Sequence, residues 1–123
     1  MRTMKPVLFC GLLLLANLLA AQVYYSNNVP RALAIKAAAS LKNGMWEESA
    51  VQHLRRSGLT NYLSVGCKTS WYRYYGLADG SDLVVYYYAR EALPGYWGGN
   101  GLVQRAFIRE GTNEISITIT NRP

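Results

Sequence analysis

The sequence predicts an α+β fold in which two N-terminal helices pack on one face of a four-stranded antiparallel β-meander. Three observations support this prediction. Two stretches with helical spacing come first, between residues 30 and 58. Two tyrosine-rich, strand-like runs then meet at Asp79-Gly80, a dipeptide typical of hairpin turns. Finally, Ile115, Ile117 and Ile119 alternate with polar residues, as in a strand with one buried face.

The first 21 residues have the layout of a secretory signal peptide. Arg2 and Lys5 precede an apolar run over residues 7–19, and Leu19-Ala20-Ala21 offers a cleavage site. This run is shorter than the ~20 apolar residues that a membrane-spanning helix needs, so cleavage is favoured over an uncleaved membrane anchor. We therefore expect a secreted or periplasmic protein that has no transmembrane span after signal cleavage.

Cysteine usage and charge narrow the class of protein further. Cys10 lies inside the apolar run, whereas a lipoprotein signal needs its cysteine at the cleavage point, so we expect no lipid anchor. Only Cys67 remains after cleavage. The sequence favours a small buried hydrophobe at Cys67, with pairing between chains or a reactive thiol as alternatives. The net charge of +6 comes from scattered residues without a basic run, which argues against nucleic-acid binding.

About 100 residues follow the signal peptide, which is enough for one domain with its own core. We expect an extended lead over residues 22–29 and a single α+β domain over residues 30–123. No internal repeat or low-complexity segment divides this stretch.

The first helix is predicted from Arg31 to Lys42. Pro30 suits the start of a helix, where its missing N–H costs nothing. Leu33, Ala37 and Leu41 recur at a spacing that places them on one face, and Asn43-Gly44 ends the helix.

The second helix is predicted from about Trp46 to Ser57. Its apolar stripe consists of Ala50, Val51 and Leu54. Glu47 and Glu48 lie in the first turn, where acidic side chains interact favourably with the helix dipole. Gly58 suits the left-handed position after the helix, and Leu59 is expected to fold back on Leu54.

The strands follow these helices. Residues 60–69 are predicted to be a mixed connection with room for a short strand near Tyr62-Leu63, and the hairpin strands cover residues 70–77 and 82–89. A glycine-rich loop over residues 91–101 leads to a third strand, from Leu102 to Arg109. Strict alternation in this strand places Val103, Arg105 and Phe107 on one face and Leu102, Gln104, Ala106 and Ile108 on the other. The isoleucine-rich segment is the fourth strand.

Residues 41–89 resemble a known family. The shared features are Asn43-Gly44-Met45, a helix that ends at Gly58, and a hairpin with an aromatic first strand and an Asp79-Gly80 turn. They resemble the SmpA/OmlA (BamE-like) family, small lipoproteins of the outer-membrane β-barrel assembly machinery, and its β-lactamase-inhibitor-protein-like relatives. Trp46 and Ser57 depart from the family pattern, and there is no lipobox cysteine. The resemblance implies a compact exported scaffold that binds other proteins through its sheet.

Catalytic chemistry has little support in the sequence. His53 is the only histidine, and no motif places it beside Cys67 as the base for a nucleophile. Asp79 is explained by the turn, and one histidine with one cysteine cannot supply a metal site. We therefore predict a non-enzymatic protein with no catalytic residues, no metal and no cofactor.

A binding surface is the better prediction. Six of the ten tyrosines lie on the hairpin, more than one small core can bury. If Leu83, Val85 and Tyr87 face the helices, then the even-numbered residues of that strand line an open face. On the first hairpin strand, either Tyr72 and Tyr74 or Trp71, Arg73 and Tyr75 join them, depending on register. The candidate partner-binding residues are Tyr72, Tyr74, Tyr86, Tyr88, Tyr96 and Trp97.

Tyrosine and tryptophan provide large contact areas at low entropic cost, which favours protein recognition. The predicted function is therefore an exported protein-interaction module that binds a protein partner of the cell envelope through an aromatic sheet face. The alternative is a protein that binds a glycan or another small ligand by stacking on exposed tyrosine and tryptophan rings. For Tyr96 and Trp97 the sequence leaves open whether the loop is an exposed tip or folds back over a sheet edge.

Overall fold

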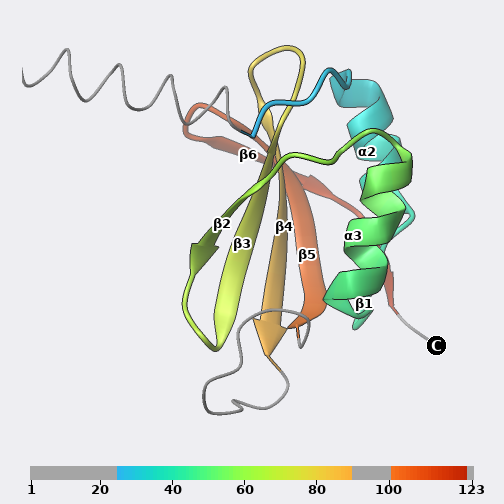
Figure 1. The fold of residues 1–123 in the computed structure, drawn as a ribbon, viewed down its shortest axis with the longest axis vertical. Helices are drawn as coiled ribbons and strands as arrows, with labels where there is room; N and C mark the ends of the chain where they lie inside the picture. Colours follow the sequence, from blue (N-terminus) through green and yellow to red (C-terminus); the bar gives the residue numbers. More distant parts are fainter. Residues whose placement is uncertain (1–24, 90–100, 122–123) are drawn as a thin grey trace, which may run out of the picture.

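The computed structural model describes residues 25–89 and 101–121 (Figure 1). Two helices, α2 (Arg31–Ala39) and α3 (Glu47–Arg56), lie together on one face of an antiparallel sheet whose strand order is β2-β3-β4-β5-β6. The sheet strands are β2 (Leu63–Gly66), β3 (Ser70–Gly76), β4 (Asp82–Ala89), β5 (Gly101–Glu110) and β6 (Asn113–Ile117). Two further strands, β1 (Lys42–Asn43) and β7 (Thr120–Asn121), form a small parallel pair.

The prediction of two leading helices on a four-stranded meander is wrong in its architecture. The sheet has five strands, because Leu63–Gly66 pairs with β3 as a complete edge strand. The helices are also not the first elements of the fold: Ser26 already bridges to Gly76, and β1 separates α2 from α3. The strand pairs that the prediction lacked are short or join distant segments, so alternation within a single window does not reveal them.

The segment before α2 is tied to the sheet by Asn27. Its side-chain Nδ2 donates to the carbonyl of Asn61 at 2.8 Å, and its Oδ1 accepts from the backbone N–H groups of Thr60 and Asn61. Its backbone N–H donates to Gly76. Buried Asn27 therefore joins the segment before α2 to the residues that precede β2 and to the end of β3, a role that the sequence alone did not indicate.

Helix α2 is shorter than predicted, and its predicted face is only partly buried. It ends at Ala39, and its buried residues are Ala34, Ala37 and Ala38. Leu33 is exposed, whereas Leu41 is fully buried beyond the end of the helix. Alanine side chains are small, so the backbone of α2 can pack closely on its neighbours. The spacing of Leu33 and Leu41 therefore did not identify the buried face correctly.

The predicted end of α3 is confirmed. Gly58 has a φ of 91°, and the N–H of Leu59 donates to the carbonyl of Leu54 at 3.1 Å. Leu54 and Leu59 are both buried in the same core cluster. This is the Schellman arrangement, in which a left-handed glycine allows the chain to reverse and the following leucine to contact the last turn.

The predicted hairpin is confirmed as β3–β4, with Tyr72 paired to Tyr86 and Tyr74 paired to Val84. Asp79 stabilises its turn by accepting hydrogen bonds from the backbone and hydroxyl of Ser81, and Gly80 takes a φ of 86°. The pairing places Leu83, Val85 and Tyr87 on the helix side, where all three are fully buried.

Strand β5 does not alternate strictly as predicted. Its register shifts where Tyr86 pairs with Arg105 but Tyr87 pairs with Val103, which leaves Gln104 as an extra residue. Such a bulge reverses the alternation on one side of it. Val103 therefore joins the core beneath the helices. The prediction that Leu102 shares a face with Ala106 and Ile108 is wrong.

No helix in the part of the chain that the structure describes is long and apolar enough to cross a membrane. The predicted signal peptide over residues 1–21 lies outside the described residues, as do most of the glycine-rich loop and its two aromatic residues, Tyr96 and Trp97.

Candidate functional site

The four described candidate tyrosines lie on the sheet face opposite the helices. Strand alternation and the β3–β4 register place Tyr72 and Tyr74 beside Tyr86 and Tyr88 on this face, and all four are half-buried. Both described helices lie on the other side of the sheet (Figure 1). The alternative register, which would have placed Trp71, Arg73 and Tyr75 on the open face, is therefore wrong.

Tyr72 is the centre of this surface. Its ring centroid lies 4.7 Å from that of Tyr86, its cross-strand partner, and 6.3 Å from that of Tyr74. Phe107 on β5 meets the Tyr72 ring edge to face, at 6.5 Å and an interplanar angle of 78°. Contacts of this kind favour fixed positions for aromatic side chains, so the rings of this part of the face pack on one another.

Buried apolar side chains lie beside the aromatic rings on the same face of the sheet. Val84 is fully buried although it points away from the helices, and Phe107 is 2% exposed. Both are absent from the core cluster beneath the helices. The outer side of the sheet therefore has a small apolar layer of its own, with the tyrosines over it.

Two arginines add positive charge to the rings. The guanidinium carbon of Arg105 lies 4.6 Å from the Phe107 ring centroid, and that of Arg109 lies 5.3 Å from the Tyr74 ring centroid. Arg105 also pairs loosely with Glu114, at 3.6 Å, and both side chains are about half exposed, so this ion pair contributes little to stability. We call the set Tyr72, Tyr74, Tyr86, Tyr88, Arg105, Phe107 and Arg109 the aromatic face.

The aromatic face continues onto the edge strand β2. Leu63 pairs with Tyr74 and Val65 pairs with Tyr72, and their side chains are 42% and 49% exposed. The candidate binding residues predicted from the sequence did not include Leu63 or Val65, although the sequence left room for a short strand near Tyr62-Leu63. The alternation of Leu63 and Val65 around Ser64 was the available signal, but it is too brief to distinguish a strand from a loop.

The opposite face of the same hairpin carries a buried polar cluster. Arg73 pairs with Glu47 of α3, with 3.6 Å between Nη2 and Oε1, and both side chains are at most one-tenth exposed. The indole N–H of Trp71 donates to the other oxygen of Glu47. The sequence interpretation of Glu47 as a helix-start charge is incomplete, because its carboxylate is the partner of two strand residues.

Two tyrosine hydroxyls are buried beside this ion pair. Those of Tyr75 and Tyr87 have no hydrogen-bond partner among the described residues. Burial raises the pKa of Tyr75 to about 12 and raises the pKa of Tyr87 well above its ordinary value. Both tyrosines therefore stay neutral in the physiological range.

The two residues considered for catalysis have separate partners. The ring Nε2 of His53 on α3 lies 3.1 Å from the carbonyl oxygen of Ala37, and Cys67 lies after β2 with its sulfur 3.2 Å from the Thr69 hydroxyl. Cys67 is exposed, so its interpretation as a buried hydrophobe is wrong. Hydrogen bonding to Thr69 lowers the pKa of Cys67 to about 7. No group of three or more potential metal ligands occurs within residues 25–89 and 101–121.

No known protein-family model matches this chain, and searches of curated proteins and of solved structures likewise find no match.

Proposed function

We propose that this protein is an exported, non-enzymatic interaction module of the cell envelope, which binds a protein partner through the aromatic face and the adjoining β2 edge. One observation carries the proposal: half-buried tyrosines, exposed Leu63 and exposed Val65 form a continuous surface on the side of the sheet that the described helices leave open. Tyrosine and arginine are the residue types that most often dominate binding energy at protein interfaces.

The order of this surface supports a protein partner. The Tyr72 ring already contacts the rings of Tyr86 and Phe107, so little side-chain entropy remains to be lost on binding. The tilts between Tyr72 and its neighbours Tyr74 and Tyr86 are 34° and 43°, and all three rings are half-buried. Stacking on a sugar needs a flat and open ring face, so this geometry favours a protein over a glycan.

The decisive test is capture of the partner by paired variants. The wild-type protein should retain a specific envelope protein after cross-linking, and Leu63→Lys combined with Val65→Lys should abolish that retention. Because both side chains are already exposed, the thermal stability of this variant should remain near that of the wild type. Tyr75→Phe is the matched control, since it alters a hairpin tyrosine on the buried side.

The outcomes separate the candidate functions. Equal capture by the lysine variant and the wild type would contradict the proposed binding face. Retention by purified cell-wall polysaccharide in place of a protein would support the glycan alternative. Export is tested separately, because the protein purified from its own cells should begin at Gln22.

A further inference from the structure

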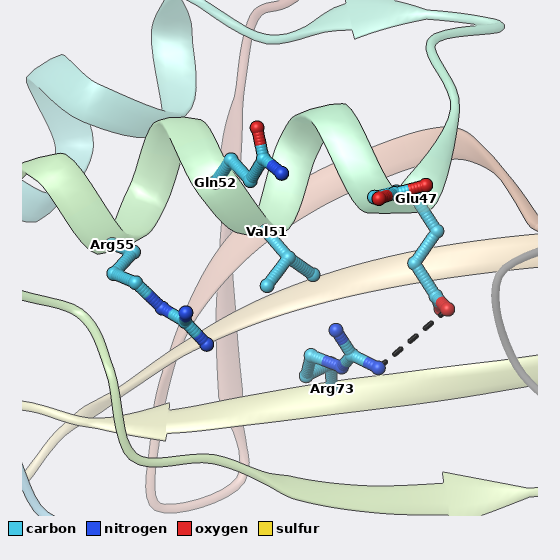
Figure 2. Close-up of a pocket in the computed structure, with 6 residues that line it drawn as sticks. Glu47, Val51, Gln52, Arg55 and Arg73 are labelled. Atoms are coloured by element: carbon cyan, nitrogen blue, oxygen red, sulfur yellow. Dashed lines mark ion pairs between the residues drawn. The ribbon is translucent and has the colours of Figure 1, made fainter.

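A small cleft opens between α3 and the sheet, on the face away from the aromatic face. It has a volume of about 310 Å³ and is lined by Glu47, Glu48, Val51, Gln52 and Arg55 of α3 and by Arg73 of β3 (Figure 2). On the neighbouring edge strand β2, the residues on the helix side of the sheet are Ser64 and Gly66, which pair with Arg73 and Trp71. Their small size leaves space beside α3. The volume is at the lower end of the range typical of small-ligand sites.

Arg73 forms the sheet side of this cleft and is incompletely paired. Its residue is 8% exposed, and Nε has no hydrogen-bond partner among the described residues. The contact with Glu47, at 3.6 Å, is longer than a hydrogen bond. The Tyr62 ring lies over the guanidinium, 4.1 Å from its central carbon, so a ligand must approach along the guanidinium edge.

Arg55 supplies a second cation on the helix side. Its side chain is exposed and forms no ion pair within the described residues. Figure 2 shows it reaching from α3 toward the sheet, while Val51 points into the space between Arg55 and Glu47. The cleft therefore combines two guanidinium groups with one apolar side chain.

We propose that this cleft binds a carboxylate, held between Arg55 and Arg73, whose apolar remainder lies against Val51. Guanidinium groups match the planar geometry of a carboxylate and form charge-assisted hydrogen bonds with it. Glu47 and Glu48 also line the cleft and offset the charge of the two arginines, so a dianion such as phosphate is repelled more strongly than a monocarboxylate. The carboxylate can belong to a free small acid or to the C-terminus of a peptide.

The test is titration of the ¹⁵N-labelled protein, in the form that its cell accumulates, with four probes. Benzoate represents the free acid, and a short peptide ending in phenylalanine with a free carboxylate represents the chain end. Benzamide and the C-terminally amidated peptide are their neutral counterparts. The arginine Nε–H signals are the readout, and we expect those of Arg55 and Arg73 to shift with a carboxylate and not with its neutral counterpart.

Variants locate the site. Arg55→Gln should weaken binding about tenfold, which is the loss of one charge-assisted hydrogen bond. Arg56→Gln removes the neighbouring exposed charge outside the cleft and should leave the affinity unchanged. Arg55 is exposed, so its replacement is not expected to disturb folding, unlike replacement of the buried Arg73.

A response to benzoate alone would identify a free acid as the ligand, and a response to the peptide alone would identify a chain end. The proposal is overturned if neither carboxylate shifts the arginine signals, if the neutral probes shift them equally, or if Arg55→Gln binds as well as the wild type. Because the aromatic face is on the other side of the sheet, loss of partner capture there would leave this result unaffected.

Discussion

The two faces of the β3–β4 hairpin place the same residue type in opposite environments. On the inner face, Tyr75 and Tyr87 are fully buried and their hydroxyls have no described partner. On the outer face, Tyr72 and Tyr86 contact each other and remain half-buried. Alternation along a strand assigns neighbouring tyrosines to these different sides. Residue type alone therefore does not show which tyrosines are accessible. That depends on which face of the sheet the helices cover.

The largest expected effect comes from truncating one tyrosine on each face. Tyr87→Ala should lower the free energy of unfolding by about 3–5 kcal/mol, because it removes a fully buried aromatic side chain that stacks on Trp71. Tyr88→Ala, the next residue, should cost about 1 kcal/mol. Urea denaturation of the two variants measures the difference. Similar losses would mean that the outer face is as structural as the inner one.

A smaller effect, of opposite sign, is expected from removing only a hydroxyl. Tyr87→Phe should raise the free energy of unfolding by about 1 kcal/mol, because it deletes a buried polar group that has no partner among the described residues. Tyr86→Phe, on the half-buried outer side, should change stability by less than about 0.5 kcal/mol. Clear destabilisation of Tyr87→Phe would show that the hydroxyl is hydrogen-bonded in solution.

The smallest effect concerns two acids near the hairpin turn. Burial raises the pKa of Asp82, although the charge of Arg109 opposes the shift. Hydrogen bonds from Ser81, and more weakly the Arg31 charge, lower the pKa of Asp79. Ionised Asp82 therefore disfavours folding, and this cost appears as the pH rises through its folded pKa. Ionised Asp79 favours folding, and its contribution is lost as the pH falls below 3.8 through its lowered folded pKa.

Substitution at each acid should therefore change stability in opposite directions. Near neutral pH, Asp82→Asn should melt above the wild type and Asp79→Asn below it. Both differences should shrink as the pH falls and the wild-type carboxylates become protonated. Thermal melts from neutral to acidic pH provide the measurement. A difference between Asp82→Asn and the wild type that does not vary with pH would show that the ionisation of Asp82 is not its cause.

The parts of the fold that local chemistry dictates were predictable. Gly58 and Leu59 specify the end of α3, and Asp79-Gly80 specifies the hairpin turn, since in each case neighbouring residues determine the backbone path. Alternation also grouped Leu83, Val85 and Tyr87 on one face, but it did not determine that the helices cover this face.

The remaining features depend on residues that are distant in sequence. The bulge at Gln104 arises from the way β5 pairs with β4, where the register shifts between Tyr86 and Tyr87. Leu63 and Val65 belong to a strand because they pair with β3. The Glu47–Arg73 contact joins a helix to a strand that follows it. Consequently, the aromatic face was predicted in outline but its β2 edge was not, and the cleft beneath α3 had no sequence signature.

The parallel pairing of β1 with β7 has a consequence for the order of folding. It joins the segment between α2 and α3 to one that follows β6, and β1 is also hydrogen-bonded toward β5 through Gly44 and Val103. Closing so long a loop costs entropy before the contact forms, which makes this step slow. We therefore expect α2 and α3 to pack on the sheet only after β6 and β7 have formed. The amide protons of these helices and strands should then exchange with solvent as one cooperative unit.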